Sequence, residues 1–284
     1  MRRGILALLV CSLVAIGCAS IGSANADPMR TNDAYAAMGD SVAAGDGLPL
    51  AGTGVVATAC GRSTQAYPYA VASSLNMALN DVACSGATTD KGVFGPQQIS
   101  STTTLPSQVD QAFAVNNPRL VTVTIGANDV NWQQLITQCY TTGCGTTQDN
   151  QQFEASLLQL RAKLAVTLGD IRLHQGWTPN QVLVTGYYSP VSTAQPQCSD
   201  TQGLTNTEIT WINSKEQELN NVIRESVAVF PSAHYVPLNF TGHELCSSDP
   251  WVQGVQAAAP FHPTAAGQAA IATAVLDAAK AYHV

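Results

Sequence analysis

The chain has 284 residues, of which 45% are hydrophobic and only 11% are charged, and its formal net charge is -7. This length and hydrophobic content suit one large α/β domain or two small ones with a packed core. The acidic balance argues against nucleic acid, which needs a basic face, and against a polybasic membrane patch, so neutral or apolar substrates fit better.

Residues 1–26 have the features of an export signal. Two arginines follow Met1, residues 5–16 form an apolar run too short to span a membrane comfortably, and residues 24–26 read Ala-Asn-Ala, a typical cleavage site. We therefore expect a secreted protein whose mature form starts at Asp27 and has no transmembrane segment. As an alternative, residues 15–18 resemble an imperfect lipobox, in which Cys18 would carry a lipid anchor.

An even number of cysteines remains after the signal. Eight occur in the chain, and Cys11 and Cys18 lie within the signal. In an exported protein the other six imply disulfides, because the compartment is oxidising, and six cysteines allow fifteen pairings. Metal ligation is less favoured, because the sequence contains no C-x-x-C pair. The six are Cys60, Cys84, Cys139, Cys144, Cys198 and Cys246.

Short apolar runs alternate with longer helical patterns from about residue 30 onward, which indicates a parallel sheet flanked by helices. Runs rich in β-branched residues predict the strands. In chain order the predicted strands are residues 34–38, 77–83, 120–125, 181–187 and 234–238. The predicted helices are residues 64–74, 107–113, 152–173, 205–229 and 264–281. Residues 45–64 and 87–104 read as ordered surface loops. No linker divides the chain, so we expect one domain over residues 27–284.

Four short segments carry residues suited to one reaction. They are Gly-Asp-Ser at 39–41, Cys-Ser-Gly at 84–86, Gly-Ala-Asn-Asp at 126–129 and Pro-Phe-His-Pro at 260–263. The first three each follow a predicted strand, and ligand sites of open parallel sheets lie beyond the carboxyl ends of the strands. We therefore expect the segments to meet in one cleft.

The side chains of these segments suit hydrolysis of an ester. A serine hydroxyl such as that of Ser41 is a weak nucleophile unless a base lies beside it, and His262 is the candidate base. The backbone N–H groups of Ser41 and Gly86, with the side-chain amide of Asn128, would stabilise the oxyanion of a tetrahedral intermediate. Asp129 is interpreted as a structural neighbour that bonds loop backbone. Taken singly, each segment is also compatible with an ordinary turn or cap.

With all four segments in this order, the chain resembles the SGNH (GDSL) hydrolase superfamily, whose signature residues match Ser41, Gly86, Asn128 and His262. The resemblance covers nearly the whole mature chain. It implies a flavodoxin-like, three-layer α/β/α sandwich with a five-stranded parallel sheet. It also implies a serine esterase or lipase that forms an acyl-enzyme on Ser41, needs no cofactor or metal, and acts as a monomer on a small-molecule or lipid ester.

The resemblance also bears on the disulfides. Secreted actinobacterial members of the family have three sequential bridges, which here would join Cys60 to Cys84, Cys139 to Cys144 and Cys198 to Cys246. Four residues separate Cys139 from Cys144, so their bridge would close a tight loop.

The sequence departs from the family pattern beside the histidine. The family usually has Asp three residues before this position, where this chain has Ala259. Some exported members hold the imidazole with a main-chain carbonyl, which here would belong to Ala259 or Pro260. A carbonyl can fix the tautomer, although it stabilises the imidazolium less than a charge does. Asp249 is the alternative partner for His262.

Two other functions stay open at this point. A carbohydrate acetylesterase would use the same site, and Ala259 motivates a catalytically inactive module that binds cell-wall glycan or lipid. The aromatic side chains of Tyr67, Trp132, Tyr187 and Trp251 are candidates for a substrate wall, although aromatics near predicted core elements are more often packing residues.

Overall fold

A computed structural model describes residues 33–114, 117–176 and 181–284. The predicted export signal and Cys18 lie outside these ranges. Residues 31–284 belong to one compact unit. None of the helices within the described ranges is long and apolar enough to cross a membrane.

Five parallel strands form the central sheet, as the sequence predicts. In chain order they are β1 (Ala34–Gly39), β2 (Ala78–Asp81), β5 (Leu120–Thr124), β6 (Gln181–Thr185) and β7 (Ala233–Val236), and their spatial order is β2-β1-β5-β6-β7. This is the flavodoxin-like order, in which the direction of winding reverses between the first strand and its inner neighbour. The switch point lies between β1 and β5, whose register places Gly39 beside Thr124.

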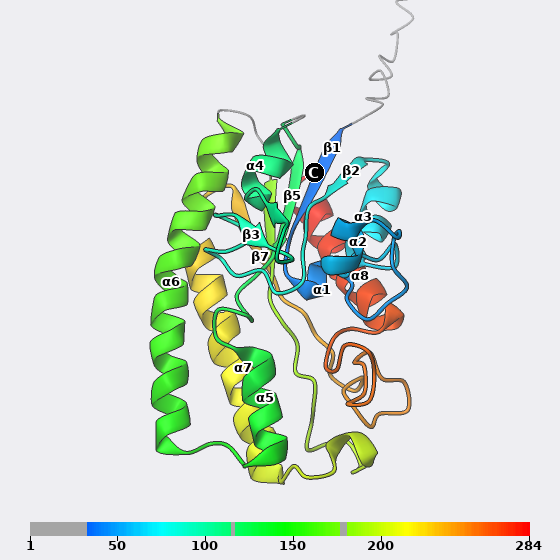
Figure 1. Cartoon of the computed structure of the whole chain (residues 1–284), viewed down its shortest axis with the longest axis vertical. Helices are drawn as coiled ribbons and strands as arrows, with labels where there is room; N and C mark the ends of the chain where they lie inside the picture. The colour runs from blue at the N-terminus through cyan, green and yellow to red at the C-terminus, as the bar shows by residue number, and fades with distance from the viewer. Residues whose placement is uncertain (1–32, 115–116, 177–180) are drawn as a thin grey trace, which may run out of the picture. The chain divides into compact units, whose positions relative to one another are not determined.

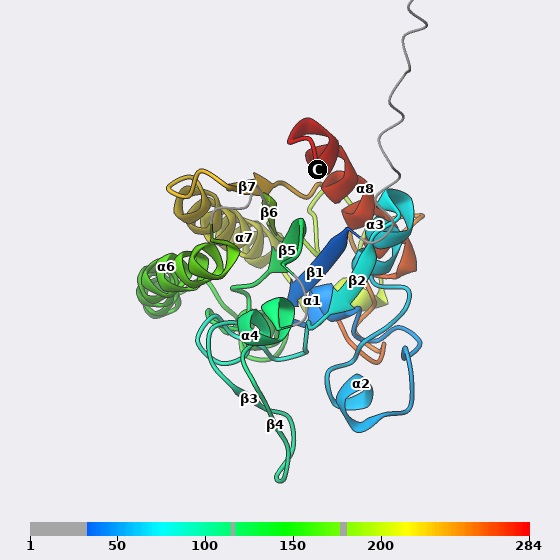
Figure 2. The ribbon, with the colours of Figure 1, turned by 90° about the horizontal axis from the view of Figure 1, so that it is seen from above.

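Helices cover both faces of the sheet, which confirms the three-layer α/β/α sandwich (Figures 1 and 2). On one face lie α3 (Tyr67–Leu75) and α8 (Ala265–Ala281). On the other lie α4 (Gln108–Phe113), α6 (Thr147–Gln175) and α7 (Asn206–Val227). Because both faces are covered, every residue of β5 is buried, as expected for a strand of an all-parallel sheet.

The five predicted helices all form, but α6 begins five residues before the predicted start at 152. Its first turn is polar and therefore has no apolar period to indicate a helix. A capping box starts it instead, in which Thr146 and Asp149 exchange side-chain and backbone hydrogen bonds. The same device, from Thr205 and Glu208, starts α7.

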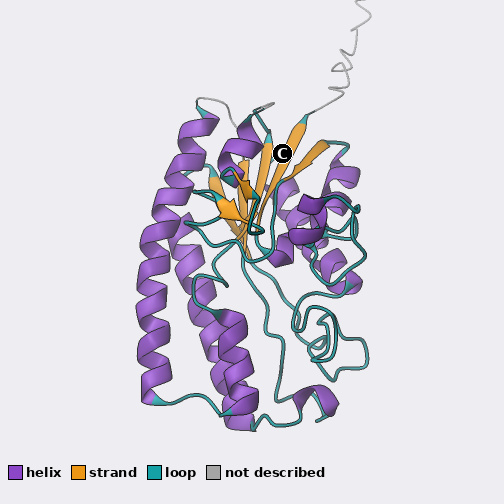
Figure 3. Ribbon diagram, in the orientation of Figure 1, coloured by secondary structure: helices purple, strands orange, loops and turns teal. Residues whose placement is uncertain are grey.

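Loops and short elements cover the carboxyl end of the sheet (Figure 3). Several of them are absent from the prediction, because each is too short or too polar to show a helical or strand period. They are α1 (Ser41–Ala44), α2 (Val55–Ala59), α5 (Trp132–Thr141), the 3-10 turn η1 (Ser199–Thr201) and the hairpin of β3 (Gln97–Gln98) with β4 (Thr104–Leu105). The last hairpin and α2 lie within segments predicted to be loops.

Three disulfides hold these connections, in the sequential pattern that the family resemblance implies. They join Cys60 to Cys84, Cys139 to Cys144 and Cys198 to Cys246. The first ties the segment after α2 to the segment that follows β2.

Candidate active site

Ser41 is the first residue of α1 and follows the end of β1 by a single residue. The intervening turn requires glycine at position 39, where φ is +143° and a Cβ atom would lie 2.3 Å from the Thr124 carbonyl oxygen. The Asp40 side chain caps α1 by accepting the Val42 N–H at 3.0 Å. Ser41 therefore lies at the carboxyl edge of the sheet, at the start of a helix.

Two buried glutamines hold this turn from opposite layers. Gln108 on α4 accepts the Gly39 N–H at 2.7 Å and donates to the Gly39 carbonyl at 2.9 Å. Gln268 on α8 donates to the Val42 carbonyl at 2.9 Å. Sequence analysis missed both residues. The sequence shows only that each predicted helix contains a glutamine. A glutamine buried in such a helix needs partners for both its donor and its acceptor, and this requirement was the available signal.

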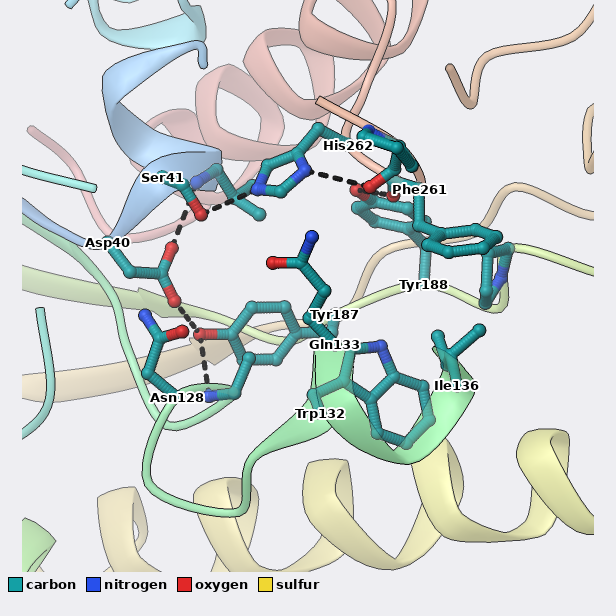
Figure 4. Close-up of a pocket in the computed structure, with 14 residues that line it drawn as sticks. Asp40, Ser41, Asn128, Trp132, Gln133, Ile136, Tyr187, Tyr188, Phe261 and His262 are labelled. Atoms are coloured by element: carbon teal, nitrogen blue, oxygen red, sulfur yellow. Dashed lines mark hydrogen bonds between the residues drawn. The ribbon is translucent and has the colours of Figure 1, made fainter. Parts of the chain in front are cut away.

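Ser41 and His262, which are 221 residues apart in sequence, lie in direct contact. The Ser41 hydroxyl is 2.7 Å from Nε2 of His262, and Nδ1 of the same ring is 3.0 Å from the Pro260 carbonyl oxygen (Figure 4). A carbonyl only accepts hydrogen bonds, so Nδ1 carries the proton and Nε2 is free to accept the serine proton.

Main-chain hydrogen bonds fix the loop that carries His262. Phe261 has a φ of +68°, a left-handed conformation that costs about 1 kcal/mol in a residue with a side chain. Its N–H donates to Gln253 at 3.0 Å, and its carbonyl accepts the Tyr188 hydroxyl at 3.0 Å. The Ala259 carbonyl accepts the main-chain N–H of His262 at 3.2 Å. Of the two carbonyls that the sequence offered for the ring, the structure therefore uses Pro260.

Asp249 faces a different histidine. Its carboxylate is 3.4 Å from Nδ1 of His243, and its main-chain carbonyl accepts from the same nitrogen at 2.8 Å. The carboxylate is 69% exposed. The alternative in which Asp249 orients His262 is thus wrong for this structure.

Of the candidate oxyanion donors, Ser41 and Asn128 line one pocket, whereas Gly86 is not among its lining residues. Asn128 lines the same pocket as Ser41 and His262, and its amide donates to the Ala87 carbonyl at 2.8 Å with one of two N–H bonds, which leaves the other for a substrate. Gly86 has a φ of +76°, and a Cβ atom there would meet only Nε2 of Gln97, at 4.0 Å. Within the described ranges, the N–H groups of Ser41 and Gly86 donate to no other protein group.

Hydrogen bonds to the Asp129 carboxylate connect the Asn128 loop to the loop after β2. Its carboxylate accepts the N–H of Thr89 at 3.0 Å and the Thr89 hydroxyl at 2.6 Å. Lys163 on α6 lies 3.5 Å from the same carboxylate. This confirms the structural interpretation of Asp129.

A second buried carboxyl group lies next to the nucleophile. Asp40 is 1% exposed, and burial raises its pKa to about 7, against the opposing effect of hydrogen bonds from the Tyr187 hydroxyl and the Val42 N–H. The Tyr187 hydroxyl donates to Asp40 at 2.5 Å and accepts the Ala127 N–H at 3.1 Å. Burial and the nearby Asp40 raise the pKa of Tyr187 well above its ordinary value.

An apolar wall faces Ser41 across the pocket. Trp132 and Ile136 come from α5, and Tyr188, Pro190 and Phe261 come from loops (Figure 4). Of the four aromatic residues singled out in the sequence, two line the pocket, Trp132 and Tyr187. The other two are packing residues: Tyr67 is fully buried, and Trp251 stacks on His243 with ring centroids 3.7 Å apart.

A hydroxyl, an imidazole and amide donors arranged in this way can cleave an ester by acyl transfer. Elsewhere in the part of the chain that the structure describes, no group of three His, Cys, Asp or Glu side chains could hold a metal ion.

Comparison with known proteins identifies the family. Residues 37–270 match the GDSL-like Lipase/Acylhydrolase family, and the chain belongs to it. It is 32% identical over 305 residues to Lipase 1 of Streptomyces coelicolor, covering 98% of this chain and all of that one. It is 30% identical over 256 residues to a lipase of Streptomyces rimosus, covering 86% of each.

Solved structures of the family agree with this assignment. The extracellular lipase of Streptomyces rimosus matches with a TM-score of 0.61 and 26% identity, over 86% of this chain and 98% of that one. Phospholipase A1 of Streptomyces albidoflavus NA297 matches with a TM-score of 0.63 and 27% identity, over 87% and 99%. The protein is a carboxylic ester hydrolase.

Proposed function

We propose that the protein hydrolyses carboxylic esters through an acyl-enzyme on Ser41, with His262 as the base. The observation that carries the proposal is the 2.7 Å contact between the Ser41 hydroxyl and Nε2 of His262. In the first half of the reaction, Ser41 attacks the ester carbonyl as its proton passes to Nε2. The tetrahedral intermediate collapses, and His262 returns the proton to the departing alcohol. In the second half, water repeats these steps and releases the acid.

The proposal places the oxyanion of the tetrahedral intermediate next to three amide donors. The N–H groups of Ser41 and Gly86 and the free N–H of Asn128 would stabilise it, and each such donor is typically worth about 10²–10³ in rate. His262 receives its orientation from the Pro260 carbonyl rather than from a carboxylate. The positive imidazolium therefore gains less electrostatic stabilisation than it would beside an acid.

The pocket favours an uncharged, apolar acyl group. Its wall of Trp132, Ile136, Tyr188, Pro190 and Phe261 offers aromatic and aliphatic surface without a charged side chain. Such a wall would bury an acyl chain and gain free energy from the apolar area removed from water. We therefore assign the substrates to lipid or small neutral esters.

We further propose that the protein is secreted and monomeric. Secretion is supported by the amino-terminal signal, by three disulfides and by the similarity to an extracellular lipase. Amino-terminal sequencing of protein from the culture medium tests it, since cleavage after Ala26 leaves Asp27 first. Retention in the membrane fraction would instead favour a lipid anchor on Cys18. A monomer fits because one chain supplies Ser41, Asn128 and His262 to the pocket.

A panel of p-nitrophenyl esters, from acetate to palmitate, tests the function. We expect hydrolysis that falls by at least about 10³-fold in Ser41→Ala and in His262→Ala. Ser73→Ala, an exposed position on α3, serves as the control and should match the wild type. Undiminished turnover in Ser41→Ala would contradict the proposal.

The same panel separates the alternatives. Turnover of acetate alone would favour a carbohydrate acetylesterase. No turnover of any ester, with retained binding to cell-wall material, would favour an inactive binding module, against which the similarity to lipases already counts.

A further inference from the structure

The hydroxyl group of Tyr187 joins two of the segments that form the site. It donates to the Asp40 carboxylate at 2.5 Å and accepts the Ala127 N–H at 3.1 Å (Figure 4). Asp40 directly precedes Ser41, and Ala127 directly precedes Asn128. One oxygen atom thus links the neighbour of the proposed nucleophile to the neighbour of the proposed oxyanion donor.

The bridge spans the point where the two segments diverge. β1 and β5 stay hydrogen-bonded up to Asp40, whose N–H donates to the Thr124 carbonyl at 2.9 Å. Beyond this point one chain enters α1 and the other enters the loop that carries Asn128, so sheet pairing no longer sets their separation. The Tyr187 hydroxyl supplies a connection there, from the end of the next strand, β6.

Tyr187 is itself held firmly. Its main-chain N–H donates to the Asn220 side chain at 2.8 Å, and its carbonyl accepts from the same side chain at 3.0 Å. Asn220 lies on α7 and also donates to Glu216, which accepts the Ser189 hydroxyl at 3.1 Å. The ring is 4% exposed. Because backbone, ring and hydroxyl are all fixed, the residue can define a distance between the groups it joins.

We propose that Tyr187 is a positioning residue for ester hydrolysis, whose hydroxyl fixes Ser41 relative to Asn128 so that the amide meets the developing oxyanion. The inference rests on the proposed function. Its physical basis is that an oxyanion donor acts only at hydrogen-bond distance from the charged oxygen, so a displacement of less than 1 Å weakens it. Such a donor contributes mainly in the transition state, hence its misplacement lowers kcat more than it raises KM.

Tyr187→Phe is the principal test, because phenylalanine keeps the ring and removes only the bridging oxygen. We expect kcat to fall roughly 10–100-fold, with KM within about 3-fold of the wild type. The affinity for a trifluoromethyl ketone, which forms a tetrahedral adduct, should fall by a similar factor, whereas the affinity for the product acid should not.

Tyr35→Phe is the matched control. Tyr35 on β1 is fully buried and shares a 2.7 Å hydrogen bond with the Thr122 hydroxyl, away from the pocket. The Tyr35→Phe variant loses one buried tyrosine hydroxyl, as the Tyr187→Phe variant does. We expect a comparable fall in melting temperature and unchanged kcat. A kcat in Tyr187→Phe equal to that of Tyr35→Phe would contradict the inference.

A double-mutant cycle with Asn128→Ala tests whether Tyr187 affects kcat through the Asn128 amide. If Tyr187 acts through Asn128, then Tyr187→Phe should lower kcat by less than about 3-fold once the Asn128 amide is gone. If the kcat of the double variant falls by the product of the two single-variant factors, the inference is overturned. Should Tyr187→Phe fail to fold, Asp40→Asn replaces it: the Asn oxygen can still cap Val42, but its NH₂ group can only donate to the Tyr187 oxygen. This reverses the bridging hydrogen bond and removes its charge, so a kcat loss in the same direction is expected.

Ser41→Ala separates this inference from the proposed function. Loss of activity in Ser41→Ala, with normal kcat in Tyr187→Phe and in Asp40→Asn, would reject the bridge and leave the serine mechanism intact. Retained activity in Ser41→Ala would reject the serine mechanism and the inference with it.

Discussion

At the residue scale, the orientation of His262 depends on main-chain geometry and not on a carboxylate. The Pro260 carbonyl accepts the Nδ1 proton at 3.0 Å, in a loop whose central residue, Phe261, is held in a left-handed conformation. The position of a main-chain carbonyl depends on the conformation of its loop. Here the loop conformation therefore orients the imidazole, as an aspartate side chain does in the common family pattern. The hydrogen bonds of Phe261 with Gln253 and Tyr188 therefore help to hold His262, the proposed base, in place.

The position of Asp249 gives a direct test of this arrangement. We expect Asp249→Ala to keep kcat/KM within about 2-fold of the wild type, because its carboxylate faces His243 and is mostly exposed. Initial rates on a p-nitrophenyl ester, with circular dichroism to verify folding, provide the measurement. A folded Asp249→Ala variant with activity as low as that of His262→Ala would show that Asp249 reaches the base in the working enzyme.

The candidate reacting groups could be picked out in the sequence because each lies in a short motif. Ser41 and Asn128, which follow strands of the parallel sheet, line one pocket with His262, whereas Gly86 does not line it. Sequence reasoning did not find the roles of Gln108, Gln268 or Tyr187. These residues act through partners 69, 226 and 147 positions away, and no local pattern records such contacts.

At the element scale, the sheet was predictable from the sequence, but the short helices that line the site were not. α1 carries Ser41 and α5 supplies two residues of the pocket wall, yet neither was predicted. In α5 only Ile136 and Cys139 are buried, so an apolar period is missing and tertiary packing stabilises the helix. The inner strands β1, β5 and β6 were predictable because burial on both faces requires continuous apolar runs.

The three disulfides should differ in their effects on stability and on activity. Their sequence separations are 24 for Cys60–Cys84, 5 for Cys139–Cys144 and 48 for Cys198–Cys246. From loop-closure entropy, paired Cys→Ala changes should lower the free energy of unfolding by about 3.5, 2 and 4 kcal/mol, respectively. Urea denaturation provides the measurement.

Activity should respond most to the first disulfide. Cys60–Cys84 holds the segment that carries Gly86, and the Ser85 N–H donates to the Cys60 carbonyl at 3.0 Å. We expect kcat to fall several-fold in Cys60→Ala/Cys84→Ala and to change little in Cys139→Ala/Cys144→Ala, assayed where both variants are folded. Equal kcat values in the two variants would show that the bridge does not position this segment.

At the scale of the whole molecule, buried acids make stability depend on pH. Burial raises the pKa of Asp40 from 3.8 to about 7 and that of Glu216 from 4.5 to about 7. The folded state therefore holds these protons more tightly than the unfolded state, and the free energy of unfolding falls as pH rises from about 4 to about 7. Burial also raises the pKa of Asp81 from 3.8 to about 6, which acts in the same direction, whereas the lowered pKa of His234 opposes this change.

We expect the protein to be roughly 2–5 kcal/mol less stable at about pH 8 than at about pH 5, as measured by urea denaturation. Glu216→Gln should reduce this difference, because it removes one of the buried acids whose pKa is raised. Glu225→Gln is the control, since Glu225 lies on the same helix with a half-exposed side chain paired to Arg161. Stability that rises between these pH values would contradict the assignment of raised pKa values.

The sequence by itself determined the layered architecture, the five strands, the family and the candidate groups for the reaction, because periodicity and short motifs are local properties of a chain. Only the tertiary structure decided which carbonyl holds His262, what Asp249 faces, and how Tyr187 links Asp40 to Ala127. Those contacts join residues that are adjacent in space and distant in sequence, and their distances depend on how the loops at the carboxyl edge of the sheet pack against one another.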